Sequence, residues 1–116
     1  MKINPKDMKV QVNTNMRGGI GDVTLVHLQS GDQLAPHCRL HAQITVPAGN
    51  SIGYHVHEGE TEVFHFISGK GHVDDDHEIV DIQSGDVVVT GPGHGHAVIA
   101  DKGEDLVFDA VITLEK

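Results

Sequence analysis

The chain has 116 residues and a formal net charge of −9, with 17 acidic and 8 basic side chains. This length suits one ordinary domain, and the acidic balance argues against nucleic acid and anionic lipid as partners. The single cysteine, Cys38, excludes an intrachain disulfide, and no apolar run is long enough to span a bilayer. The N-terminus lacks the pattern of a secretory leader, which predicts a cytoplasmic protein.

Short segments of alternating polar and apolar residues follow one another along the chain, separated by turns that contain glycine. Even-numbered residues of 39–46 are apolar, and the same alternation runs through 105–114. Residues 74–78 predict a polar hairpin tip, and no segment keeps an apolar stripe at helical spacing. The chain therefore predicts an all-β sandwich or barrel that occupies residues 1–116 as one domain. The segments expected to form strands are 23–28, 39–46, 63–67, 79–82, 87–90 and 105–114.

Histidine is unusually frequent, with ten residues against one tyrosine, three phenylalanines and no tryptophan. So few large rings argue against a nucleic-acid binder that works by base stacking. Because histidine is the commonest metal ligand, its excess indicates a metal site without locating it.

Two clusters in the second half of the chain carry the residues that a metal site needs. In a strand His55 and His57 share a face, about 6.5–7 Å apart at Cα, so that both imidazoles can reach one ion. Residues 58–61 suit a turn, which places the carboxylate of Glu62 beside this pair. Downstream, a Gly-Pro-Gly turn precedes His94 and His96, either of which could face the ion. Each piece alone also fits ordinary exposed or core residues, but together they predict a metal site.

The spacing of these residues resembles two sequence motifs of the cupin superfamily. The second motif departs from the family pattern at two places, because its proline falls one position late, at Pro92, and Ala100 stands at its asparagine position. The resemblance implies a double-stranded β-helix (a jelly-roll barrel), one divalent ion and a homodimer. It also favours His96 over His94, so that the implied ligands are His55, His57, Glu62 and His96. The first motif, at 49–69, is matched by Gly49, His55, His57, Glu62 and Gly69, and the second, at 85–100, by Gly85, Gly93 and His96.

A divalent ion held by neutral imidazoles and one carboxylate would keep a net charge near +1 and attract a small carboxylate or polyol-like ligand. Mn²⁺ or Fe²⁺ suits this mixed nitrogen and oxygen shell, with Zn²⁺, Ni²⁺ and Co²⁺ as alternatives. Arg39 and Gln43 share the odd-numbered face of 39–46, which is either solvent-exposed or part of the pocket. If it is part of the pocket, both are candidates for substrate binding, Arg39 as a carboxylate clamp. The sequence identifies no catalytic residue.

Two classes of function follow from the resemblance. The favoured one is a metal-dependent enzyme for a small carboxylate or other oxygenated compound, of decarboxylase, dioxygenase, lyase or isomerase type, by analogy with oxalate decarboxylase. The alternative is a non-catalytic cupin that binds metal and a small ligand for sensing or storage. A polar residue near the open metal positions would support chemistry, an apolar wall would support binding, and a closed tetrahedral shell would indicate a structural metal.

Overall fold

Ten β-strands dominate residues 1–115, the part of the chain that the computed structural model describes. Three short 3-10 turns accompany them: η1 (Pro5–Asp7), η2 (Met16–Gly18) and η3 (Gly31–Gln33). No helix in this range is long and apolar enough to cross a membrane. The strands are β1 (Lys9–Thr14), β2 (Asp22–Gln29), β3 (Cys38–Val46), β4 (Ser51–Val56), β5 (Glu60–Ser68), β6 (Lys70–Asp75), β7 (Glu78–Gln83), β8 (Val87–Thr90), β9 (Gly95–Ala100) and β10 (Leu106–Leu114).

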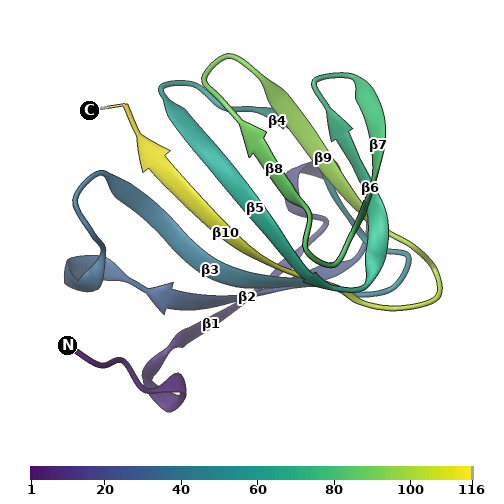
Figure 1. Ribbon diagram of the computed structural model, residues 1–116. Helices are drawn as coiled ribbons and strands as arrows, with labels where there is room; N and C mark the ends of the chain where they lie inside the picture. The colour runs from purple at the N-terminus through teal and green to yellow at the C-terminus, as the bar shows by residue number, and fades with distance from the viewer. Residues whose placement is uncertain (116) are drawn as a thin grey trace.

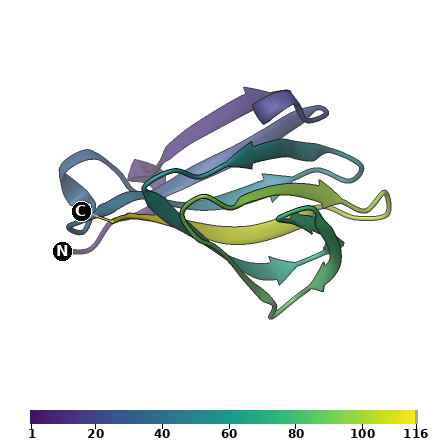
Figure 2. The same ribbon diagram turned by 90° about the horizontal axis from the view of Figure 1, so that it is seen from above.

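The strands form two antiparallel sheets that face one another (Figure 1 and Figure 2). The six-stranded sheet has the order β1-β2-β3-β10-β5-β8, and the four-stranded sheet has the order β4-β9-β6-β7. From β3 onward the chain passes back and forth between the two sheets, because β4, β6, β7 and β9 lie in one and β5, β8 and β10 in the other. This topology is the expected all-β jelly roll.

The core lies between the sheets and is built by the alternation that the sequence predicts. Ala42, Ile44 and Val46 of β3 are buried, and so are Leu106 and Phe108 of β10. β10 lies in the middle of the larger sheet, where it pairs with β3 on one side and β5 on the other. The even-numbered face of both predicted strands therefore packs inward, as expected from a period of two residues.

Two register shifts lie beside the interior cavity described below. The pairing of β3 with β10 moves from Leu40 directly to Cys38, which leaves Arg39 as an extra residue. The pairing of β4 with β9 shifts between Ile52 and His55. A bulge of this kind redirects side chains, and as a result Arg39 and Leu40, neighbours in the sequence, both line the same cavity.

Candidate metal centre

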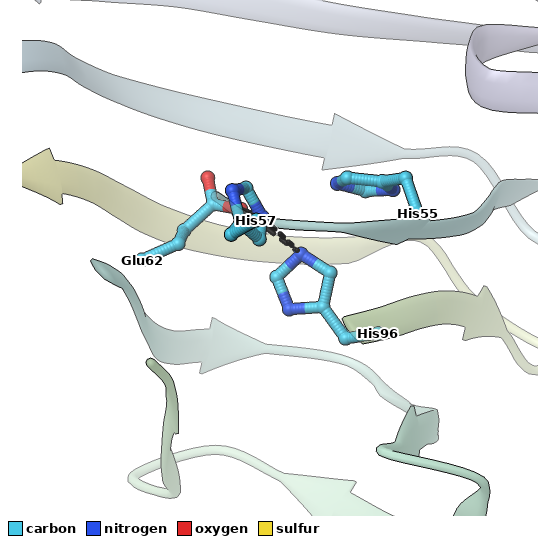
Figure 3. A group of neighbouring side chains, drawn as sticks. All are labelled: His55, His57, Glu62 and His96. Carbon is cyan, nitrogen blue, oxygen red and sulfur yellow. Dashed lines mark hydrogen bonds and ion pairs between the residues drawn. The ribbon is translucent and has the colours of Figure 1, made fainter. Parts of the chain in front are cut away.

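One group of side chains within residues 1–115 could hold a metal ion, and it consists of the four ligands expected from the sequence: His55, His57, Glu62 and His96 (Figure 3). Their potential ligand atoms all lie within 4.8 Å of one another. His57, Glu62 and His96 are buried, while His55 is half-buried. The four side chains come from both sheets, so the site forms only when the two sheets face each other.

Backbone pairing brings these residues together. His55 lies opposite His96 in the ladder between β4 and β9, and Glu62 of β5 lies opposite Thr90 of β8. His57 follows the end of β4, and its N–H donates to the carbonyl of His94 at 3.0 Å. The N–H of Gly93 in turn donates to the carbonyl of His57 at 2.7 Å. The Gly-Pro-Gly turn therefore holds His57 in place through its backbone.

The separations between the inward atoms match the edges of a metal coordination shell. Nε2 of His57 and Nε2 of His96 are 3.0 Å apart, and each lies 3.0 Å from Oε1 of Glu62. Donors at about 2.1 Å from an ion and at right angles to each other are about 3.0 Å apart, whereas tetrahedral donors are about 3.4 Å apart. The three atoms therefore fit one face of a six-coordinate ion.

Each imidazole presents Nε2 to the centre because its Nδ1 has a partner elsewhere. His55 donates from Nδ1 to the carbonyl of Gly53 at 2.8 Å, and His57 donates to Oε1 of Glu60 at 2.8 Å. Nδ1 of His96 lies 2.8 Å from Oγ1 of Thr90, which accepts its proton in the metal-binding tautomer. Hydrogen bonds of this kind fix the tautomer of a metal-ligating histidine and increase its basicity. The donor set therefore fits a divalent ion.

The electrostatics of the site concentrate negative charge on two carboxylates. Hydrogen bonds from His57 and His96 outweigh the effect of burial and hold the pKa of Glu62 below its ordinary value. The ion pair with Arg39 lowers the pKa of Glu60 to about 2, so that this carboxylate stays ionised. The hydrogen bond to Glu62 raises the pKa of His57, whereas burial lowers the pKa of His55. A cation at the centre would take the place of the direct contact between Nε2 of His57 and Oε1 of Glu62.

Removing the Thr90 hydroxyl tests whether these outer partners support metal binding. We expect Thr90→Val, which keeps the shape of this buried side chain, to weaken metal affinity roughly 10- to 100-fold because Nδ1 of His96 loses its partner. Competition with a chromophoric chelator measures the change. Thr45→Val, a half-buried position of β3 away from the site, is the matched control. Equal affinities in the two variants would mean that Thr90 does not orient His96.

A cavity of about 100 Å³ opens onto the metal ligands. Besides the candidate ligands His55, His57 and Glu62, its polar lining residues are Arg17 and Arg39. Every other side chain that the described chain contributes to the wall is apolar, among them Leu40, Ile52 and Phe64. Phe64, two residues after Glu62 in β5, therefore shares its side of the strand and contributes to an apolar floor of the cavity.

The remaining candidates occupy different places. Arg39 lines the cavity, but Nε and Nη2 donate to Glu60 at 2.8 and 3.0 Å. Gln43 is not among the lining residues and donates to Asp109 at 3.5 Å on the outer face of the sheet. The side chain of His94 is exposed and donates to Asp76 at 2.9 Å, and so it does not belong to the ligand group.

Three contributors to the site were missed by the sequence analysis. Glu60 lies in the segment 58–61, for which the sequence predicts only a turn, yet it joins His57 to Arg39. Thr90 was seen only as the end of a strand, and Arg17 carried no signal. For Glu60 the available clue was its position three residues after His57, at the start of the next strand.

Comparison with known proteins identifies a family model, a relative and solved structures that are similar to this chain. A family model described as a cupin domain matches residues 42–113. A protein from Thermotoga maritima named oxalate-binding protein is 41% identical over 101 residues, which cover 87% of this chain and 84% of that protein. A crystal structure from Thermotoga maritima, described as a predicted oxalate decarboxylase, has a TM-score of 0.89 and 37% identity over 98% of this chain and 99% of that one.

A more distant structure shares the fold alone. A polyketide cyclase from Streptomyces resistomycificus has a TM-score of 0.78 at 17% identity, and the match covers 100% of this chain and 80% of the cyclase.

Proposed function

The chain belongs to the cupin domain family, and from this premise we propose that it is a metal-dependent binding protein for a small carboxylate. The ion is held by His55, His57, Glu62 and His96. A divalent ion, when bound, supplies Lewis-acid positions for the oxygens of a carboxylate ligand. The residues of the chain orient the ligands, enclose the cavity and set its charge.

The polar residues that the cavity wall adds to the candidate ligands, which the sequence analysis expects to support chemistry, are arginines, and arginines suit binding better than proton transfer. A general acid or base needs a side chain whose pKa lies near the working pH. Apart from the metal ligands, the ionisable groups that residues 1–115 place in this wall are Arg17 and Arg39. Because a guanidinium cannot be deprotonated in a protein, neither of them can move a proton. Within residues 1–115 the wall thus supports carboxylate binding and, apart from the candidate ligands, provides no side chain for general acid–base catalysis.

Charge and size favour a small anion. The ion with neutral imidazoles and one carboxylate has a net charge near +1, and the arginines add positive charge at the same cavity. A volume of about 100 Å³ is well below the roughly 300–1,000 Å³ of pockets for drug-sized ligands. That room suits an acid of two or three carbon atoms. The name of the 41% identical relative, an oxalate-binding protein, makes oxalate the first ligand to test.

The finer features of this function are part of the proposal. Manganese or iron is the ion we favour, because the 3.0 Å separations suit a six-coordinate shell. Arg39 keeps N–H groups that Glu60 does not occupy and could contact the ligand with them. A homodimer in the cytoplasm stays a prediction from the sequence.

Calorimetry and a turnover assay on the same samples test the proposal. We expect oxalate to bind the manganese-loaded protein, to give no measurable heat with the protein stripped by chelator, and to remain intact after prolonged incubation. Release of formate or carbon dioxide, or uptake of oxygen, would favour the enzymatic alternative. Failure of oxalate and of other two- and three-carbon acids to bind the loaded protein would overturn the proposal.

A further inference from the structure

A short segment between β1 and β2 covers one side of the metal cavity. It runs from Asn15 to Gly21 and includes the turn η2. Met16 packs partly buried against the core, and both Met16 and Arg17 line the cavity. Met16 and Arg17, which lie far from the two motifs in the sequence, therefore contribute to the wall of the candidate metal site.

Backbone contacts hold this segment firmly against the beginning of β4. The N–H of Ser51 donates to the carbonyl of Ile20 at 2.9 Å, and the N–H of Ile20 donates to Oγ of Ser51 at 3.0 Å. The approach is so close that a Cβ atom at Gly53 would overlap the carbonyl of Arg17, and one at Gly19 would overlap the carbonyl of Ser51. Glycine is required at both positions for the segment to lie where it does.

Arg17 and Arg39, the two arginines of the cavity, differ in whether a carboxylate neutralises their charge. Glu60 neutralises Arg39 through two hydrogen bonds at 2.8 and 3.0 Å. No ion pair within residues 1–115 joins Arg17 to a carboxylate. Arg17 also adopts φ 55° and ψ 28°, a left-handed conformation uncommon for a residue with a side chain. Arg17 is exposed, and as a lining residue it brings to the open side of the cavity a positive charge that no carboxylate within residues 1–115 neutralises.

We propose that Arg17 is the residue that makes this site prefer a dianion over a monoanion of the same shape. The inference rests on the proposed carboxylate-binding function. The loaded metal shell carries a net charge near +1, the Arg39–Glu60 pair carries none, and Arg17 adds a further +1. The total charge of about +2 complements the two negative charges of a small dicarboxylate. A charge-assisted hydrogen bond from a guanidinium to a carboxylate is also directional as well as strong.

Oxalate and oxamate separate this role from simple ligand binding, because oxamate has nearly the same shape but one negative charge fewer. Titration calorimetry on the manganese-loaded protein should show that Arg17→Gln weakens oxalate binding roughly 10- to 100-fold, while oxamate binding changes less than about 3-fold. Arg17→Lys should recover part of the oxalate affinity. Lys70→Gln removes one exposed positive charge away from the cavity and should leave both affinities unchanged.

Gly19→Ala provides a second route to the same result without altering Arg17 or a metal ligand. The added methyl group should displace the segment, so that selectivity for oxalate falls while metal content stays at the level of the unaltered protein. Equal losses for oxalate and oxamate in Arg17→Gln, or no loss for either, would overturn this inference and leave the proposed function standing. Absence of oxalate binding by the unaltered loaded protein would overturn both.

Discussion

Replacement of His57 by alanine is expected to leave the purified protein with little metal. Nε2 of His57 lies 3.0 Å from Oε1 of Glu62 and 3.0 Å from Nε2 of His96. The variant therefore lacks one of the three donor atoms whose spacing fits a metal coordination shell. Loss of an outer partner of a ligand costs roughly 10- to 100-fold in metal affinity, and loss of a ligand itself should cost more than about 100-fold. Elemental analysis of protein from its native host, compared with the unaltered chain, measures the effect.

The controls separate loss of the ligand from loss of the fold. His65→Ala removes an exposed histidine from β5, the strand that carries Glu62, and should retain metal. His55→Ala alters a half-buried position and should also lose metal with less effect on stability. His94→Ala should retain metal, because that side chain is exposed and bonded to Asp76. Undiminished metal in His57→Ala would overturn the proposed ligand set.

The grouping of the four candidate metal ligands could be anticipated because their positions follow from short-range rules. Alternation in a strand places His55 and His57 on one side, and a turn of a few residues returns the chain with Glu62. The choice of His96 over His94 came from the cupin resemblance and not from geometry. The structure supplies the physical reason, since the backbone carbonyl of His94 binds His57 while its side chain turns toward Asp76.

The parts of the fold that alternation identified are those with one buried face. The segments 39–46 and 105–114 lie in the middle of the larger sheet, and their pattern is clear for that reason. β1 was missed although Val10 and Val12 alternate with polar residues; both valines are exposed, at 62% and 57%, and contribute nothing to the core. Short strands with glycine, such as β6 and β9, give an equally weak signal.

The sequence names Arg39 and Gln43 as candidates but leaves open whether each lies in the cavity or on the outer face, because that choice depends on irregular backbone. Arg39 reaches the cavity through a bulge in β3, whereas Gln43, four residues along the same strand, remains on the outer face with Asp109. A strict period of two would have placed both on the same side. Arg17 depends on a turn docked against β4, a contact between segments more than thirty residues apart. Neither feature has a local signature.

Truncation of Phe108 to alanine should cause a large loss of stability without removing a candidate metal ligand. Its side chain is fully buried in β10, and its ring lies 4.7 Å from that of Phe64 and 5.0 Å from that of Phe66. Such a change costs about 3–5 kcal/mol, a large part of the stability of a small domain. Chemical denaturation should show this loss, with a fall in Tm of about 10–20 °C. Thr113→Ala, at an exposed position of the same strand, should change stability by less than about 0.5 kcal/mol.

The same variant tests whether core packing supports the metal site. Phe64 stacks on His96 with ring centroids 4.7 Å apart and an angle of 19°, so the cavity left at position 108 gives Phe64 and then His96 room to move. Because a ligand that binds only the folded state raises its stability in proportion to the logarithm of its affinity, excess manganese should raise the Tm of Phe108→Ala less than that of the unaltered protein. An equal rise in both would mean that the backbone pairing of β4 with β9 positions His96 without help from the aromatic core.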